Sequence, residues 1–252
     1  MLELGGEDYK EMAEGDGHIK TGSVRRLIAG EPIGVFYGYR FDGIFQNEEE
    51  CKQQTSSASP IGVGLRRYKD LNGDGKVDAA NDREILGDAN PKFFGGLTNT
   101  FAYKGFELNV FLQYSYGNKI LNYNAMELEN PTGGQNAYAD MVNRWTPENP
   151  SNIYPKATTN RAILASDRFI EDGSYLKLKT LSLSYSFPKI NMKHIQGLRL
   201  YVTGQNLLTW TKYRGYDPEV SYRGASTLEA GEDFGGYPQS RTFMFGVKLD
   251  IK

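Results

Sequence analysis

Long runs of alternating apolar and polar residues near the end of this 252-residue chain constrain its fold more than any other feature. In residues 241–251 every second position is apolar. These positions are Phe243, Phe245, Val247, Leu249 and Ile251, and they alternate with Thr242, Met244, Gly246, Lys248 and Asp250. Because successive side chains of a β-strand point to opposite faces, the pattern predicts a strand with one apolar face and one largely polar face.

The same alternation predicts further strands along the chain. They are expected at residues 18–30, 33–45, 93–103, 106–117, 175–187 and 198–210. The run at 106–117 is the clearest, because Phe106, Leu108, Val110, Leu112, Tyr114 and Tyr116 share one face. Lys104-Gly105, between two of these strands, is typical of a tight turn. The chain is therefore expected to be all-β, with antiparallel neighbours.

The lengths of the connections between these strands separate into two classes. The connections at 104–105 and 188–197 are short, whereas those at 46–92, 118–173 and 211–240 are long. Since antiparallel neighbours alternate in direction, the short connections should lie at one end of the sheet and the long ones at the other. Short turns on one side and long extracellular loops on the other are typical of an outer-membrane β-barrel. Alternation alone would also fit a soluble β-sandwich with one buried face.

The alternation slips out of phase within residues 175–187. Leu176 and Leu178 occupy even positions, whereas Leu181, Leu183 and further apolar residues occupy odd ones. Either Lys177 and Lys179 lie on the apolar face among lipid headgroups, or a bulge near Thr180 shifts the register. The sequence leaves both explanations open.

Composition adds three limits. The net charge of −2 gives no reason to expect a nucleic-acid partner. No apolar run reaches the roughly 18 residues that a membrane-spanning helix needs. The 17 Tyr, 13 Phe and 2 Trp could supply aromatic girdles at the two membrane interfaces, although soluble carbohydrate-binding sheets are also rich in Tyr.

Residues 1–17 lack the basic and apolar regions of a secretory signal. We expect them to be disordered or to be part of a longer N-terminal segment, and the chain to be a piece of a larger protein. The single cysteine, Cys51, says little about compartment because it has no partner for an internal disulfide.

Residues 70–82, DLNGDGKVDAAND, resemble an EF-hand or dockerin-type calcium loop. The expected ligands are the side chains of Asp70, Asn72, Asp74 and Asp78, the carbonyl of Lys76, and Asp82 or a water molecule. Calcium takes six to eight oxygen ligands, and alternate positions of a tight loop can turn them inward. The usual glutamate at the twelfth position is replaced by Asn81. We predict a structural calcium ion here, with a turn-rich loop that needs no ion as the alternative.

No catalytic constellation emerges from the sequence, and the chain is not expected to be an enzyme. His18 and His194 are far apart, and one cysteine excludes a zinc site or a credible Cys-His pair. The carboxylate groups Asp217/Glu219 and Glu229/Glu232/Asp233 lie in the connection 211–240. A glycosidase would need two carboxylates across a sugar, so we interpret them as part of a solvated loop.

Five stretches of the chain together resemble the C-terminal part of a SusC/RagA-type TonB-dependent outer-membrane transporter. They are GEPIGVFYGYRFDGIF (30–45), YKDLNGDGKVD with ILGDANPKFFGGLTNTFAYKGFELNVFLQYSYGN (68–118), RWTPENPSNIYPKA (144–157), EDGSYLKLKTLSLSYSFP (171–188) and LRLYVTGQNLLTWTKYRGYDPEVS (198–221). They follow the family order and cover most of the chain after residue 30.

The resemblance implies that residues 18–252 form an antiparallel transmembrane β-barrel segment, namely the last six to eight strands of a barrel of about 22 strands. It implies import of oligosaccharides or peptides across an outer membrane of the Bacteroidota type. It also implies that an N-terminal plug of the same protein closes the barrel lumen. The implied partners, besides membrane lipid and ligand, are a TonB complex acting through the N-terminal part and a SusD-like surface lipoprotein. Substrate-binding residues stay unassigned. A soluble calcium-dependent carbohydrate-binding β-domain is the alternative.

Overall fold

The structure is a computed structural model that describes residues 19–20, 24–130, 136–159, 163–188, 195–219, 222 and 230–251. The expectation for residues 1–17 lies outside this part of the chain. Two compact units divide the chain. One comprises residues 91–118, 173–219 and 237–252, and is called the sheet unit here. The other comprises residues 1–90, 119–172 and 220–236, and is called the connection unit.

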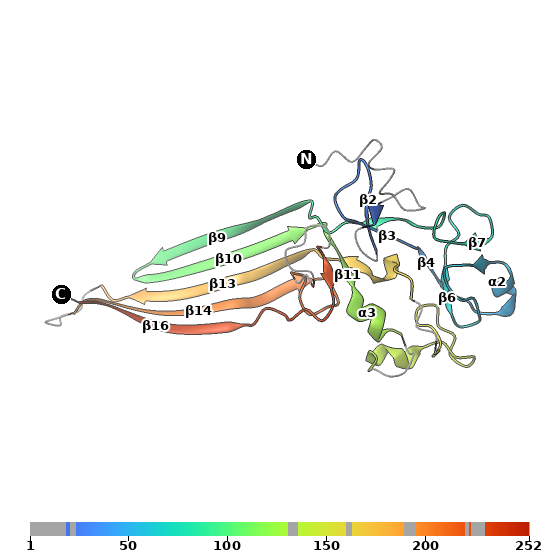
Figure 1. Cartoon of the computed structure of the whole chain (residues 1–252). Helices are drawn as coiled ribbons and strands as arrows, with labels where there is room; N and C mark the ends of the chain where they lie inside the picture. The colour runs from blue at the N-terminus through green and yellow to red at the C-terminus, as the bar shows by residue number, and fades with distance from the viewer. Residues whose placement is uncertain are drawn as a thin grey trace. The chain divides into compact units, whose positions relative to one another are not determined.

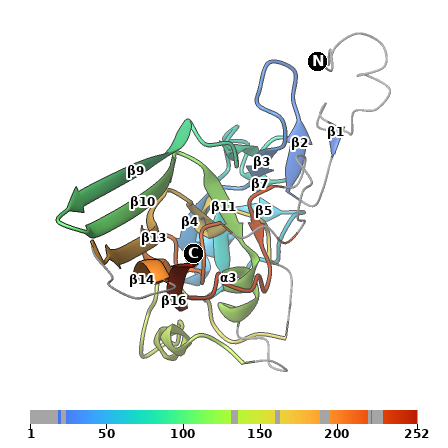
Figure 2. The same ribbon diagram turned by 90° about the vertical axis from the view of Figure 1, so that its left-hand side faces the viewer.

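The sheet unit contains one antiparallel sheet of five long strands, called the long sheet. The strands are β9 (Phe93–Tyr103), β10 (Phe106–Tyr116), β13 (Tyr175–Ser186), β14 (Ile195–Thr211) and β16 (Thr242–Ile251). Their order is β16-β14-β13-β10-β9. Figure 1 shows the strands lengthwise and side by side, and Figure 2 shows the sheet from one end. All four pairings are antiparallel, which confirms the predicted strand type and these five strands.

The turn between β9 and β10 is the expected tight one. Lys104 and Gly105 both have positive φ, 45° and 89°. Two consecutive positive φ values are the requirement of a type I′ turn, whose twist matches that of the strands it joins. A side chain at Gly105 would also meet the carbonyl oxygen of Ser186 at 2.7 Å. Glycine at this position therefore lets the hairpin pack against β13.

The register places the short and long connections at opposite ends of the long sheet. At one end Tyr103 pairs with Phe106 across the tight turn, and Ser186 pairs with Arg199. At the other end Tyr116 pairs with Phe93, and Tyr175 pairs with Thr211. The chain therefore leaves for 118–173 and for 211–240, and returns from 46–92, at this second end. The predicted segregation of connection lengths is confirmed, and the two ends are called the turn end and the loop end.

A β-bulge at Lys179 explains the phase slip in the sequence. Leu178 pairs with Leu112 and Thr180 pairs with Phe111, so that consecutive residues of β10 face residues two apart on β13. The extra residue shifts the alternation, and Leu176, Leu178, Leu181 and Leu183 share one face as a result. Lys177 lies on the opposite face, beside Gln113. Of the two explanations, the bulge is correct.

The described residues of the connection unit form short strands, the helices α2 and α3, and the 3₁₀ turns η1 and η2. The strands are β1 (Ile19–Lys20), β2 (Arg25–Leu27), β3 (Val35–Gly38), β4 (Phe41–Ile44), β5 (Thr55–Ser56), β6 (Arg66–Tyr68), β7 (Lys76–Val77), β8 (Glu84–Gly87), β11 (Lys119–Asn122), β12 (Ile170–Asp172) and β15 (Glu232–Asp233). The others are α2 (Glu48–Lys52), α3 (Tyr123–Leu128), η1 (Ala139–Asn143) and η2 (Asp167–Phe169). Asn47 and Asn122 cap the two helices by accepting hydrogen bonds from backbone N–H groups.

The described residues before position 46 share a hydrophobic core with the 46–92 and 118–173 connections. Its buried members are Val24, Phe36, Leu121, Ala125, Met126 and Phe169, and a smaller cluster holds Tyr39, Tyr68 and Val77. The strands join distant segments: β3 pairs with β8, and β11 pairs with both β12 and β15. The segments predicted as long irregular loops therefore fold together as a unit with its own core.

The prediction of one strand at 18–30 and one at 33–45 is wrong in extent. Among the described residues of these segments, the strands are the short β1 to β4, which belong to the connection unit. Gly30, Gly34 and Gly43 have φ of 88°, 68° and 91°, and such left-handed residues interrupt a strand. Packing reinforces the break, because Phe36 and Ile44 are buried.

The described residues consequently give five long strands rather than the six to eight expected. The long sheet is open, since β9 and β16 stand at its edges and neither pairs with another strand among the described residues. The number of strands in a larger barrel stays a prediction. Within the described ranges, no helix has the length and apolar character needed to cross a membrane.

Candidate functional site

One face of the long sheet is apolar across all five strands. Cross-strand partners lie on the same face, so the register groups its residues into rows. Three of these rows are Tyr103, Phe106, Tyr185, Leu200 and Val247; Phe101, Leu108, Leu183, Val202 and Phe245; and Leu97, Leu112, Leu178 and Leu208. None of these positions carries a charged residue.

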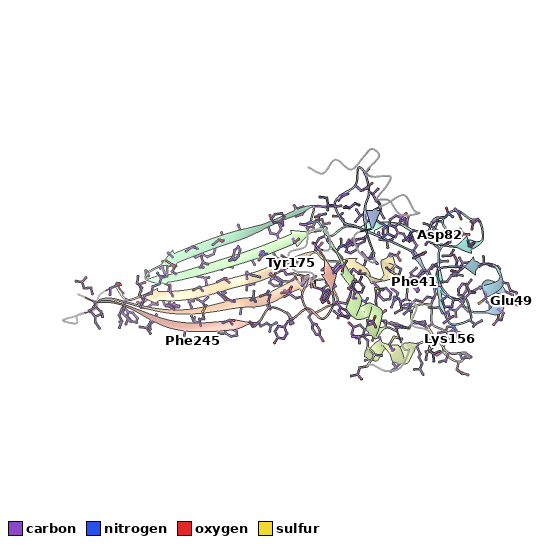
Figure 3. The ribbon with its side chains drawn as sticks, in the orientation of Figure 1. Phe41, Glu49, Asp82, Lys156, Tyr175 and Phe245 are labelled. Atoms are coloured by element: carbon purple, nitrogen blue, oxygen red, sulfur yellow. The ribbon has the colours of Figure 1, made fainter. Side chains whose placement is uncertain are left out.

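Many side chains of this apolar face are exposed. Phe245, on edge strand β16 and labelled in Figure 3, is 82% exposed. Its row neighbours Phe101 and Leu183 are also exposed, and so are Leu97 and Leu208 in another row. Soluble monomers rarely expose contiguous apolar patches of more than a few hundred Å². A face of this extent needs an apolar environment to cover it.

Aromatic side chains gather at the two ends of the apolar face. At the loop end, Phe93 stacks on Tyr116 with ring centroids 4.9 Å apart, and Trp210 lies in the next row together with Tyr114. At the turn end, Tyr185 contacts Phe106 at 4.5 Å and Phe187 at 4.8 Å. The middle rows are mainly aliphatic, apart from Phe101, Phe243 and Phe245. Aromatic bands on either side of an apolar band are what membrane interfaces select.

The opposite face of the long sheet carries hydrogen-bonded polar side chains. Near the turn end, Arg199 donates to Glu107 at 2.5 Å and to Ser184 at 2.7 Å. In the middle, the hydroxyl groups of Ser182 and Thr203 are 2.7 Å apart. These contacts join strands β10, β13 and β14 across a face suited to water or to a polar ligand.

A buried charge cluster lies at the loop end of the polar face, and is called the lysine cluster. The side chain of Lys177 is only 2% exposed, and its ammonium group pairs with two carboxylates. It donates to Asp217 Oδ1 at 2.6 Å and to Glu219 Oε2 at 2.5 Å. Lys179, displaced by the bulge, donates to the same oxygen of Glu219 at 2.9 Å. A buried charge is tolerated only when it is paired in this way.

Glu219 is held by neutral groups as well as by the two lysines. Its Oε1 accepts from the Tyr175 hydroxyl at 3.0 Å and from Gln113 Nε2 at 2.9 Å. Figure 3 labels Tyr175 at the start of β13. Burial by itself would raise the pKa of Glu219, but the hydrogen bonds from Lys177 and Lys179 outweigh burial and lower the pKa to about 2. The carboxylate is therefore ionised at neutral pH.

The lysine cluster fixes the chain where it leaves β14. Asp217 Oδ1 accepts from the backbone N–H of Glu219 at 2.9 Å, and Oδ2 accepts from that of Gln239 at 3.1 Å. One carboxylate thus joins the start and the end of the 211–240 connection. The prediction that Asp217 and Glu219 lie in a solvated loop is wrong, because Lys177 draws both into a buried ion pair. Glu232 and Asp233 are buried too, and Glu229 lies outside the described residues.

The predicted calcium loop is a set of side-chain-capped turns. Asp70 accepts from the N–H groups of Gly73 and Gly75, both at 2.7 Å. Asn72 and Asp74 each accept from the backbone N–H two residues later. Together these bonds explain why short polar side chains alternate along residues 70–78.

Asp82 closes this loop from its far end. Its two oxygens accept from Leu71 N at 2.8 Å and from Asp78 N at 2.7 Å, and the residue is fully buried. The Lys76 ammonium lies 3.3 Å from Asp78 Oδ2. Across the described part of the chain, no three or more acidic, His or Cys side chains converge as a metal site. Bound calcium therefore stays a prediction. His18 and His194 lie outside the described residues.

The comparisons with known proteins point to one family. No family model matches the chain. It is 38% identical over 99% of its length to TonB-dependent receptor P3 of Formosa agariphila, and 33% identical to TonB-dependent receptor P26 of the same organism. It is 28% identical to TonB-dependent receptor SusC of Bacteroides thetaiotaomicron over 98% of its length. The chain spans only 22–26% of these three relatives.

Solved structures give the same fold. The structure of the RagAB peptide transporter superposes with a TM-score of 0.70, covering 91% of this chain and 24% of that one, at 24% identity. The RagAB peptide importer in its 'open-open' state superposes with a TM-score of 0.67 over 92% of this chain. At this identity the likeness shows the fold alone.

Proposed function

Because the chain has the sequence of a segment of a SusC/RagA-type TonB-dependent receptor, we propose that its long sheet forms part of the barrel wall of an outer-membrane importer. The apolar face of the sheet is the observation that carries this proposal. In a membrane barrel that face contacts lipid, and the polar face lines the lumen.

The dimensions of the sheet suit this role. Its strands are 10–17 residues long, and a tilted β-strand needs about 9–11 residues to cross the hydrocarbon core. The open edges at β9 and β16 fit as well, because neighbouring barrel strands would cover their unpaired backbone groups. The connection unit then belongs to the extracellular side, where barrels carry their long loops.

A soluble carbohydrate-binding β-domain explains the same features less well. Such a domain would bury one face of its sheet in a core, whereas the apolar face here is exposed. The curated relatives are receptors rather than enzymes or lectins by name.

The ligand and the partners follow from the family resemblance and are proposals for the whole protein. We propose that it imports an oligosaccharide or a peptide, that a SusD-like surface lipoprotein assembles over the extracellular side, and that a TonB complex powers transport through parts of the receptor beyond this segment. The RagAB structures are described as peptide importers, which supports keeping peptides in the ligand class.

Cell fractionation and growth measurements test this function. The protein should sediment with the outer membrane and require detergent for extraction. A strain lacking it should lose growth on one class of nutrient when supplied with oligosaccharides or peptides as sole carbon source, and the complete gene should restore growth. Recovery of the protein as a soluble monomer without detergent would contradict the proposal.

A further inference from the structure

A small cavity lies inside the connection unit, beside the side chain of Arg66 on β6. Its volume is about 20 Å³. Polar residues of two long connections line it, including Ser59 and Tyr68 from one and Asn130 and Thr158 from the other. A cavity of about 10–15 Å³ on this measure holds one water molecule, so this cavity has room for one water molecule or one small ion.

Arg66 is buried without a carboxylate partner. The residue is 8% exposed, and its Nη2 donates to the carbonyl oxygen of Glu129 at 2.9 Å. Its Nε has no hydrogen-bond acceptor among the described residues. The ring of Phe169, with its centroid 5.9 Å from the guanidinium carbon, is at the outer limit of a cation–π contact. A buried guanidinium that is hydrogen-bonded to one neutral carbonyl keeps an uncompensated positive charge.

The neighbouring charged groups do not compensate the positive charge of Arg66. The Glu129 carboxylate lies 2.5 Å from Arg168 Nη2, and forms an ion pair with it. The Glu129 carboxylate therefore pairs with Arg168, whereas Arg66 bonds only the backbone carbonyl of Glu129 among the described residues. Burial, followed by repulsion from Arg168, lowers the pKa of Arg66, while Tyr68 and Glu129 act in the opposite direction. The site as a whole favours an added anion.

We propose that the cavity beside Arg66 binds a monatomic anion of the size of chloride. A water molecule could accept the Nε hydrogen bond, but it would leave the positive charge uncompensated. The small space beside Arg66 suits a monatomic ion better than the larger sulfate or phosphate. The anion would join the 46–92 and 118–173 connections and thereby stabilise the connection unit. This inference does not depend on the transport function.

Bromide provides a direct probe of the site in the full chain purified in detergent. Crystals grown or soaked with sodium bromide should show an anomalous difference peak within hydrogen-bond distance of Arg66 Nε. An ordered water molecule at that place, with no bromide signal, would overturn the proposal even if no variant could be purified.

Thermal unfolding gives a second readout. When chloride replaces gluconate at constant ionic strength, the Tm of the wild type should rise by a few °C, because an anion that binds the folded state stabilises it. Arg66→Met should abolish this chloride dependence. The matched control is Arg67→Met on the same strand, whose side chain pairs with Asp42 at 2.9 Å and which should keep the wild-type response. Equal Tm values in chloride and gluconate for the wild type would contradict the proposal.

Discussion

Lys177 is the residue on which the lysine cluster depends, because its ammonium group bonds the carboxylates of Asp217 and Glu219. Lys177→Met keeps the length of the side chain and removes the charge. Glu219 keeps its bond from Lys179, but buried Asp217 loses its ammonium partner, and breaking a buried ion pair from one side costs about 3–5 kcal/mol. Residues 212–219 should therefore detach from the polar face. Hydrogen–deuterium exchange of their amides should rise sharply, whereas the exposed Lys248→Met should leave it unchanged. Unchanged exchange in Lys177→Met would mean that the cluster does not anchor the connection.

The pKa of Glu219 sets the pH range of this anchoring. Its folded-state value of about 2 is below the ordinary 4.5, so the ion pair adds stability above pH 4.5 and loses that contribution as pH falls toward 2. After correction for the intrinsic pH dependence of amide exchange, exchange at 212–219 should be constant from neutral pH to about pH 5 and increase below pH 4.5. In Lys177→Met the increase should begin at a higher pH, because burial then raises the carboxylate pKa with less opposition. Identical pH profiles for both proteins would contradict the assignment.

In the loop 70–82, the turns could be predicted from the sequence, whereas the contacts that close the loop could not. The DLNGDGKVD pattern indicated a turn-rich loop, and Gly73 and Gly75 within it both have positive φ. The sequence did not predict that Asp82 would use its carboxylate for Leu71 N and Asp78 N, because that contact depends on how the loop closes. Asp217 and Glu219 were misread for a similar reason: their partner Lys177 is 40 residues away from Asp217.

Calorimetric titration tests the calcium prediction. Calcium should release heat on binding to the wild type, and Asp74→Ala should weaken binding by removing one ligand, with Asp88→Ala outside the motif as control. Strand β10 should be unaffected in exchange measurements. Absence of binding up to millimolar calcium, or equal heats for wild type and Asp74→Ala, would leave a loop stabilised by its own hydrogen bonds.

At the scale of elements, the long strands were predictable and the connection unit was not. The boundaries of β9, β10, β13 and β16 follow from period-two alternation to within a residue. Alternation is a local property, so the sequence carries it directly. The short strands β2 to β8 are held by partners distant in the sequence and by a shared core. Their own residues show no sustained period, which is why 18–45 was wrongly extended into two long strands.

The bulge at Lys179 makes a sharp prediction about β13. Deleting Lys179 removes the extra residue, so its two neighbours still pair with consecutive residues of β10 and the leucines keep their face. Deleting Ser184, in a regular part of the strand, forces a one-residue slip that moves either Tyr185 or the Leu181–Leu183 segment to the wrong face. The Lys179 deletion should therefore insert into lipid vesicles in folded form, and the Ser184 deletion should not. Failure of both deletions to insert, or insertion of both, would contradict this register.

At the scale of the whole molecule, adjacent residues of β16 distinguish lipid from lumen. Phe245 lies on the apolar face and its neighbour Met244 on the polar face. A lysine facing lipid near the bilayer midplane costs about 2–4 kcal/mol. Phe245→Lys should therefore lower the urea midpoint of unfolding from lipid vesicles, whereas Met244→Lys should have a much smaller effect. Equal losses at both positions would indicate a sheet that does not separate lipid from water.

Fluorescence quenching by brominated lipids tests the central claim most directly, because the chain has only two tryptophans, and they lie in different units. Trp210 is on the apolar face near the loop end, and Trp145 in the connection unit donates to Gln46 at 3.0 Å. Single-tryptophan proteins are made by Trp145→Phe and Trp210→Phe and reconstituted in vesicles. Lipids brominated near the headgroup should quench Trp210 strongly and leave Trp145 unchanged. Equal or absent quenching of both tryptophans would contradict a lipid-facing sheet.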